Sequence, residues 1–481
     1  MDKRAIFAVK DVSGIAEFGE KLVERYGYQL HGNEAAKEVF DAKEIACQAL
    51  DPADAPAFFS DRSNGVSLLV ANFLDVESAG RSLLSWKSAM RAFDREIVDA
   101  IRAAAWLADH IAVLGNAGDY GAALEDMQER GGRFSQAFRV DRAVAALRAA
   151  SEFDFAVAQY LEVQGADAPD MGALSGYSKA MRFAWPRAQL FKQGENRHQK
   201  AALYGNFFDH FELVAGGDLD FESTLTLSRA AYLIGEFERP ATALLRHGKV
   251  VHAAFGADHA EALQRGLSSP DASGSWLVVN GNLGEQGLEF ALKHGVFGIL
   301  APDFTEPERA VLKEASPAVK AVVSTSGLGY DALHEARTVI GGALVQDKDR
   351  SAINPMEWTV GSLAQPLVED WEILLFAAKV ARHVDSIALV VANAEGLVGF
   401  ESGHYSTRRA WDALRRRDLE MKDAVAVVDT EEIAPAILTE MKQRGIRAVI
   451  KPVGGKEAEH LSAANEAGLV LLSMSKSLKR W

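Results

Sequence analysis

Short apolar runs alternate with amphipathic patterns along most of the chain. Apolar runs of this length are typical of buried strands, whereas apolar positions that recur every three to four residues predict helices. In the first part of the chain, the strand-like runs and helical patterns are residues 5–9, 15–26, 68–72, 111–114, 123–130 and 137–161. Alternation of this kind predicts an α/β layer built around a mostly parallel sheet.

A segment rich in Gly, Pro, Asp and Ser at residues 165–176 is predicted to be a linker. The alternation resumes after it, and two sets of strand-like runs of similar length are divided near residues 341–349. The runs are residues 241–245, 275–279, 298–300 and 321–324 in one set, and 387–392, 424–428, 448–450 and 469–472 in the other. We therefore expect a first domain over 1–165, a linker over 166–188, and a duplicated pair of subdomains over 189–345 and 346–481.

Composition narrows the classes of function. The chain has 481 residues, more than one hydrophobic core usually supports, and its net charge of −15 excludes a general nucleic-acid binder, which needs a basic surface. Cys47 is the only cysteine, so neither a disulfide framework nor a cysteine-based zinc site can form. The first residues form no signal-peptide pattern and no apolar run is long enough to span a bilayer. We expect a cytoplasmic protein that acts on small molecules and makes no contact with membranes.

The most informative motif follows the predicted linker. Residues 189–204 read QLFKQGENRHQKAALY. This resembles Leu-Arg-Tyr-Gly-Glu-Asn-Pro-His-Gln, which opens the transformylase half of the bifunctional purine-biosynthesis family that combines AICAR transformylase with IMP cyclohydrolase. Gly194, Glu195, Asn196, His198 and Gln199 match, and an Arg stands where the family has Pro.

Weaker matches occur in the family's order along nearly the whole chain. They are residues 101–105 (IRAAA), residues 341–349 (GGALVQDKD), residues 376–384 with Ser386, Gly403 with Arg408, and residues 452–455. The resemblance implies an α/β protein with an N-terminal methylglyoxal-synthase-like (IMP cyclohydrolase-like) domain. A C-terminal, duplicated, cytidine-deaminase-like α/β transformylase domain would follow it.

The resemblance also implies an activity. The family moves a formyl group from 10-formyltetrahydrofolate, its co-substrate, to the 5-amine of AICAR ribotide. Because that amine is a poor nucleophile, the site must remove its proton and stabilise an oxyanion. The resemblance assigns the base to His247; Arg246 replaces the family's Lys beside it, and Lys249 is the nearest candidate for the missing amine.

The resemblance further implies a homodimer that binds a ribotide and a folate and holds no metal. The residues that it assigns to substrate binding are Gly194, Glu195, Asn196, His198, Gln199, Gln346, Asp347, Ser386 and Arg408. A structural interpretation stands beside several of these. The Gly194–Gln199 segment fits a turn locked by polar side chains, His247 fits a histidine at a strand end, and the basic residues 408–417 fit the exposed face of a predicted helix.

The chain departs from the family at several points. The Asn-Pro-Cys-Gly that follows the family's Lys-His pair is replaced by residues 248–251 (GKVV), its Asn after Ser386 is Ile387, and residues 429–435 (DTEEIAP) replace Asp-Ala-Phe-Phe-Pro-Phe. In the first half, residues 31–35 (HGNEA) stand where the family has the phosphate-binding loop Ser-Thr-Gly-Gly-Thr. We expect cyclohydrolase activity to be lost. Two hypotheses stay open for the rest: a formyltransferase, or a non-catalytic ribotide- or folate-binding paralogue with a regulatory or partner-subunit role.

One metal motif is excluded. His259 and Glu261 have the His-x-Glu spacing of zinc deaminases, but that chemistry also needs Pro-Cys-x-x-Cys, which one cysteine cannot supply. We expect these two residues to lie on a surface helix.

Overall fold

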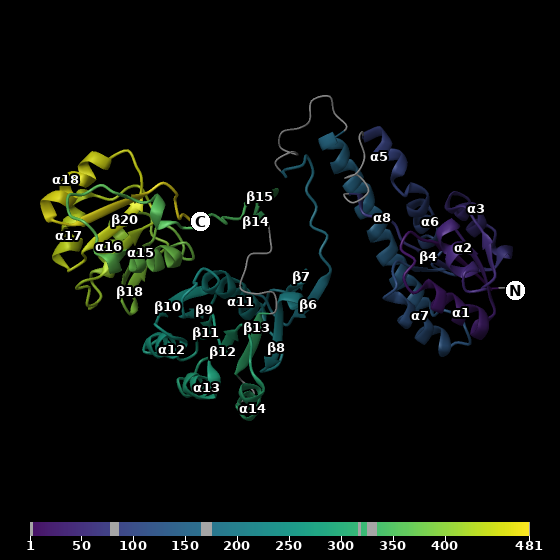
Figure 1. The fold of residues 1–481 in the computed structure, drawn as a ribbon, viewed down its shortest axis with the longest axis horizontal. Helices are drawn as coiled ribbons and strands as arrows, with labels where there is room; N and C mark the ends of the chain where they lie inside the picture. The colour runs from purple at the N-terminus through teal and green to yellow at the C-terminus, as the bar shows by residue number, and fades with distance from the viewer. Residues whose placement is uncertain (1–2, 77–85, 165–175, 316–318, 325–333, 481) are drawn as a thin grey trace. The chain divides into compact units, whose positions relative to one another are not determined.

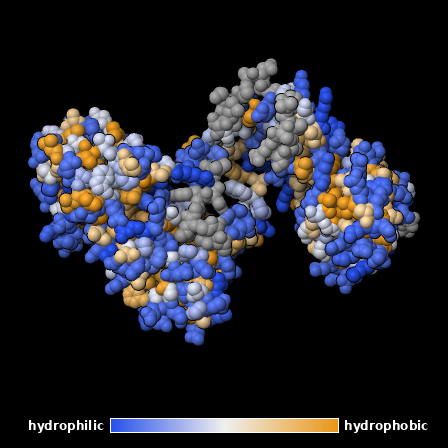
Figure 2. All heavy atoms as spheres, in the orientation of Figure 1, coloured by the Kyte–Doolittle hydropathy of each residue, from blue (hydrophilic) through white to orange (hydrophobic). Residues whose placement is uncertain are grey.

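The chain forms two compact units, Met1–Ala184 and Trp185–Trp481 (Figure 1). We describe a computed structural model over residues 3–76, 86–164, 176–315, 319–324 and 334–480. The predicted linker at residues 165–176 lies outside this range except for Gly176. On the face drawn in Figure 2, hydrophilic residues cover most of each unit. None of the described helices is long and apolar enough to cross a membrane.

The first unit is an α/β layer with a fully parallel sheet in the order β3-β2-β1-β4-β5. Its strands are β1 (Lys3–Ala8), β2 (Tyr28–Gly32), β3 (Cys47–Ala49), β4 (Val66–Ala71) and β5 (Ala112–Leu114). Its helices are α1 (Ile15–Tyr26), α2 (Glu34–Asp41), α3 (Ala55–Ser60), α5 (Trp86–Ala92), α6 (Arg95–Ala105), α7 (Asp119–Gln128) and α8 (Gln136–Gln164).

Alternate residues of each strand supply two separate cores, one on each face of this sheet. Ile6 and Leu69 pack in the core that includes α6 and α8, whereas Phe7 and Leu68 pack in the core that includes α1 and α7. Both faces are covered, which explains why the strands are continuous apolar runs in the sequence.

The second unit contains two halves with the same topology. Its first half has β8 (Phe211–Ala215), α11 (Phe221–Ile234), β9 (Ala241–Arg246), β10 (Lys249–Phe255), α12 (His259–Leu267), β11 (Trp276–Val279), α13 (Gly284–Lys293), β12 (Gly298–Ala301), α14 (Glu306–Glu314) and β13 (Lys320–Ser324). The second half has β16 (Thr359–Val360), α15 (Val368–Ala381), β17 (Leu389–Asn393), β18 (Gly396–Glu401), α16 (Thr407–Leu414), β19 (Val425–Val428), α17 (Pro435–Gln443), β20 (Ala448–Pro452), α18 (Glu457–Ala467) and β21 (Val470–Met474).

A single twelve-stranded sheet runs through both halves in the order β16-β21-β20-β19-β17-β18-β10-β9-β11-β12-β13-β8. Read outward from its centre, each half gives a hairpin, then three parallel strands, then an antiparallel edge strand. The halves meet where β10 pairs with β18 through Ala254 and Gly396. This repeated order confirms the predicted duplication.

Two further hairpins belong to the second unit. One is β6 (Arg187–Phe191) with β7 (Ala201–Tyr204), and the other is β14 (His334–Val339) with β15 (Gly342–Asp347). The strand β6 begins within the segment 166–188 that the sequence assigned to a linker, and β14–β15 spans the predicted division between subdomains.

Two predicted elements differ from those observed. The run 387–392 starts its strand only at Leu389, because the backbone N–H of Ala388 donates to the Asp429 carboxylate rather than to a neighbouring strand. The helix expected to carry the basic residues ends at Leu414, so Arg415–Arg417 follow it.

Candidate functional site

The turn between β9 and β10 places His247 beside a carboxylate. His247 and Gly248 form a two-residue hairpin loop, and both have positive φ, 52° and 68°. Left-handed backbone is uncommon for a residue other than glycine and often marks a functional position. The ring Nδ1 of His247 lies 2.7 Å from a carboxylate oxygen of Glu222, which is on the first turn of α11. Nδ1–H can donate to that carboxylate, which leaves Nε2 able to accept a proton.

Arg246 and Lys249, on either side of the His247–Gly248 loop, differ in how far the protein restrains their side chains. Arg246 is half-buried, and its guanidinium donates to the carbonyl oxygens of Asp271, at 3.0 Å, and Ser273. It is therefore anchored to a loop and cannot move to follow a substrate. Lys249, which pairs with Arg246 across the hairpin, is exposed.

The motif Gly194–Gln199 forms the loop between β6 and β7 and is held by its own hydrogen bonds. The N–H of Gly194 donates to the carbonyl oxygen of Gln199 at 2.9 Å, and the Gln199 side-chain oxygen accepts from the N–H of Asn196 at 2.8 Å. The side chains of Glu195 and His198 are exposed. The turn interpretation thus describes part of this motif, and the substrate-binding role of the exposed Glu195 and His198 stays a prediction.

Helix α11 brings the predicted site residues together. Phe191, at the end of β6, packs edge-on against Phe221 at a ring distance of 5.9 Å, and Glu222 follows directly. Arg229, two turns later, donates to the carbonyl oxygen of Gly248 at 2.8 Å. The Gly194–Gln199 loop and the His247 turn therefore share one anchor.

The chain terminus reaches the same region. Burial, together with the charge of Arg229, lowers the pKa of the Arg480 guanidinium. The backbone N–H of Arg480 donates to the hydroxyl of Ser386 at 2.8 Å. Ser386 is 7% exposed, and its hydroxyl also donates to Asp429 at 2.6 Å. With both bonds made, Ser386 can position the chain terminus, and its substrate-binding role stays a prediction.

The hairpin β14–β15 carries two further predicted residues. Gln346 and Asp347 are exposed on β15, and Asp347 pairs with His334 at 3.6 Å. The ammonium of Lys348, directly after β15, lies 3.7 Å from the centre of the Tyr232 ring on α11. The base of this hairpin thus lies at the same helix as the His247 turn.

A cavity of about 760 Å³ opens at the carboxyl ends of β19 and β20. Thr430, Gly454 and Gly455 line it from those strand ends, and Arg408 lines it from α16. Ligands in open α/β sheets bind at this edge of the strands. Arg408 pairs with Glu440 at 2.6 Å and with Asp412 at 3.0 Å, so two carboxylates of the protein already engage its guanidinium.

His460 closes the inner side of this cavity. It is 1% exposed, and burial lowers its pKa below the ordinary histidine value. A histidine kept neutral here adds no charge to the cavity wall.

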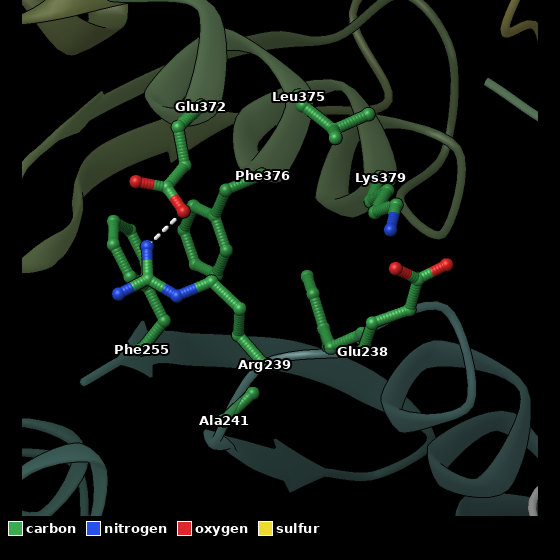
Figure 3. A pocket seen from close by; sticks show the side chains of 9 residues that line it. Glu238, Arg239, Ala241, Phe255, Glu372, Leu375, Phe376 and Lys379 are labelled. Carbon is green, nitrogen blue, oxygen red and sulfur yellow. Dashed lines mark hydrogen bonds and ion pairs between the residues drawn. The ribbon is translucent and has the colours of Figure 1, made fainter. Parts of the chain in front are cut away.

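A second cavity, of about 260 Å³, lies where the two halves of this unit meet (Figure 3). Phe255 and Phe376 face each other at a ring distance of 4.8 Å, and Arg239 pairs with Glu372. Lys379 donates to the carbonyl oxygen of Glu236 at 2.5 Å, and burial lowers the pKa of its ammonium. The cations of this cavity are held by the protein's own oxygens, so we interpret it as a joint between the halves.

In the first unit, the segment matching the family's phosphate loop has another role. The Asn33 side chain accepts from the N–H of Ala36 and caps α2, and it also donates to the carbonyl oxygen of Val9 at 2.8 Å. Asn72 accepts from the N–H groups of Lys10 and Asp11, each at 2.7 Å. These hydrogen bonds join protein groups at the carboxyl edge of the sheet, beside residues 31–35.

Sequence reasoning missed four residues that organise the site: Glu222, Arg229, Asp429 and Arg480. Of these four, only Asp429 was indicated by the sequence, because it is the first residue of the divergent segment 429–435. The other three are recognised by their contacts alone. Within the described residues no group of three or more His, Cys, Asp or Glu side chains could hold a metal ion.

The buried carboxyl of Asp429 predicts a pH dependence. Burial raises its pKa above the ordinary 3.8, although hydrogen bonds from Ser386 and Ala388 lower it. The folded protein thus binds this proton more tightly than the unfolded chain, so the stabilising contribution is full below pH 3.8 and is lost as the pH rises through the raised pKa. We expect Asp429→Asn, which cannot ionise, to gain stability relative to wild type as the pH rises above 3.8.

Urea unfolding at each pH measures this difference. Asp418→Asn, which changes an exposed carboxylate of the same half, is the matched control and should show no such trend. Parallel pH profiles for wild type and Asp429→Asn would contradict the prediction.

Comparison with known proteins gives a consistent result. The sequence profile of the AICARFT/IMPCHase bienzyme family matches residues 104–413. The bifunctional purine biosynthesis proteins PurH of Synechococcus sp. (strain WH7803) and Desulfitobacterium hafniense (strain DSM 10664 / DCB-2) are 26% and 25% identical, each over 98% of both chains. The PurH of Ruegeria sp. (strain TM1040) is 28% identical over 98% of this chain and 97% of its own.

Among solved structures, the crystal structure of ForH covers 33% of this chain and 97% of its own, at 17% identity and a TM-score of 0.27. The family profile spans well over half of the sequence, and the predicted fold and motifs agree with it. The chain therefore belongs to the AICARFT/IMPCHase bienzyme family.

Proposed function

We propose that this chain transfers a formyl group from 10-formyltetrahydrofolate to the amine of AICAR ribotide or of a related aminoimidazole, and that its cyclohydrolase activity is lost. The observation that carries the proposal is the His247–Glu222 pair, in which a carboxylate orients an imidazole whose other nitrogen makes no hydrogen bond within the described residues. This is the arrangement a general base needs.

The proposed step uses His247 as the base. The amine nitrogen attacks the formyl carbon, the bond between that carbon and N10 of the folate breaks, and the pair of electrons leaves with N10. His247 takes the proton that the amine loses, and N10 gains a proton as tetrahydrofolate departs. The carboxylate of Glu222 stabilises the imidazolium that forms.

Two further observations support a retained transformylase activity in the second unit and a lost cyclohydrolase activity in the first. The cavity at β19 and β20 falls in the size range of cofactor sites, and Arg408, which the resemblance assigns to substrate binding, lines it. The hydrogen bonds that Asn33 and Asn72 accept support the loss of phosphate binding at the carboxyl edge of the first unit's sheet.

One observation favours the alternative of a non-catalytic ribotide- or folate-binding paralogue with a regulatory or partner-subunit role. Arg246, in the place of the family's Lys, is tied to two backbone carbonyls and keeps its proton at any working pH. Nothing beside His247 would then protonate the leaving group, unless the exposed Lys249 does so.

The test is direct. The purified protein is incubated with AICAR ribotide and 10-formyltetrahydrofolate, and release of tetrahydrofolate is followed by absorbance, in parallel with thermal unfolding in the presence of each ligand. We expect tetrahydrofolate release and no cyclisation of the formylated product to IMP. Stabilisation by the ligands without release would reject the enzyme and favour the paralogue, whereas neither effect would reject both.

A further inference from the structure

A third cavity, of about 670 Å³, lies in the first unit at the amino-terminal edge of its sheet. Lys3, Tyr28 and Val66, the first residues of β1, β2 and β4, line it, and so does His110, just before β5. Because the strands are parallel, this edge is opposite the carboxyl edge where residues 31–35 lie. The cavity is therefore separate from the place where the family resemblance puts a site in this unit.

The lining of this cavity is basic. Lys3, Arg62, Arg133 and Arg139 contribute four permanent positive charges, against one carboxylate, Asp109. The chain as a whole has a net charge of −15, so this concentration of cations runs against its overall composition. A concave surface lined by one sign of charge raises the local concentration of ions of the other sign.

The cations retain donors that the protein does not use. Lys3 donates to the carbonyl oxygen of Gly131 at 3.2 Å, which takes one of its three N–H groups. Arg139 donates to the carbonyl oxygens of Ala108 and Phe134 through two nitrogens, and Arg62 pairs with Asp109 through one. Arg133 is exposed and has no hydrogen-bond or ion-pair partner among the described residues.

His110, which also lines this cavity, contacts its neighbour Asp109. Nδ1 of His110 lies 2.8 Å from the Asp109 carboxylate, and the pKa of Asp109 is lowered chiefly by this bond. Its Nε2 atom is shielded from solvent and has no hydrogen-bond partner among the described residues.

We propose that this cavity binds a small phosphorylated molecule that carries at least two negative charges. Three guanidinium groups match the oxygens of a phosphate or pyrophosphate group, which they bind in pairs of hydrogen bonds. The volume leaves room for the remainder of a metabolite of modest size. A nucleic acid is disfavoured, because the chain's net charge of −15 opposes a long phosphate backbone.

Binding of inorganic pyrophosphate to the full-length protein, measured by titration calorimetry, tests the proposal. We expect saturable binding that weakens when the ionic strength is raised to about 0.5 M, with sulfate binding more weakly. Arg133→Gln should weaken pyrophosphate binding about tenfold, the effect of losing one charged hydrogen-bonding group. Arg130→Gln removes the same charge three residues away and outside the cavity, where it pairs with Asp126 and Glu129, so it should leave the affinity unchanged.

Two results would overturn the proposal: no saturable pyrophosphate binding by wild type, or equal affinities for Arg133→Gln and Arg130→Gln. Pyrophosphate bound in the second unit would give the second result, since neither substitution touches that unit. If Arg133→Gln unfolds, as circular dichroism would show, Arg62→Gln takes its place and carries the same expectation and the same control.

Discussion

Replacement of His247 by asparagine is expected to lower the rate of formyl transfer by about 10²–10⁴-fold, the usual contribution of a general base. Asparagine tolerates the positive φ of this position and so keeps the hairpin turn, but it has no group that can take the proton. Release of tetrahydrofolate under saturating substrates measures the loss, which should fall on kcat because the base acts in the transition state.

The partner of the base provides a graded comparison. Glu222→Gln can still accept the bond from Nδ1 but lacks the charge that stabilises the imidazolium, so we expect a loss of about tenfold. His294→Ala, on α13's carboxyl end and outside the site, is the control and should retain the wild-type rate. A His247→Asn variant that keeps the wild-type rate would exclude His247 as the base.

Replacement of Glu236 by alanine is expected to lower the free energy of unfolding by about 3–5 kcal/mol, because it leaves a buried cation without its partner. The side chains of Glu236 and Arg382 are each 9% exposed and lie 3.0 Å apart, and His383 contacts the same carboxylate oxygen at 3.2 Å. Urea unfolding measures the change, followed by a signal from the second unit.

The neighbouring carboxylate offers a matched control for this substitution. Glu238 is two residues away and exposed, so Glu238→Ala should cost less than about 1 kcal/mol. Glu236→Gln, which keeps the size and one acceptor, should lie between the two variants. Equal stabilities of Glu236→Ala and Glu238→Ala would show that Arg382 is satisfied by Ser351 and Asp349 alone.

The fold was predictable because its signals are local. Apolar runs such as those ending at Leu114 and Val428 are short, uninterrupted and flanked by helical patterns, and buried parallel strands have this form. The predicted strand at 387–392 began too early, because nothing in those residues shows that a distant carboxylate, Asp429, takes the bond of Ala388. Side-chain bonds between segments far apart in sequence leave no local pattern.

The candidate site was predictable only in part for the same reason. The motif containing His198 and the position of His247 follow from their resemblance to short motifs of the family. Glu222, by contrast, lies 25 residues before His247 and is an ordinary residue of a helical pattern, so only the folded arrangement identifies it as the partner of the base. Arg480 likewise has no local signal, because its contact with Ser386 joins positions 94 residues apart.

Although the two halves of the second unit share one topology, their two central hairpins make different contacts. The loop His247–Gly248 of the first half corresponds to Ala394–Glu395 of the second, since both are two-residue loops at the same place in the repeated strand order. Ala394 accepts a hydrogen bond from Arg265 of the first half at 3.2 Å, and Gly396 beside it forms the pairing with Ala254. The turn of the first half thus carries the proposed base, whereas the corresponding turn of the second half joins the two halves. If residues were exchanged between the two turns, we expect neither turn to make its present contacts, because the two copies are no longer interchangeable.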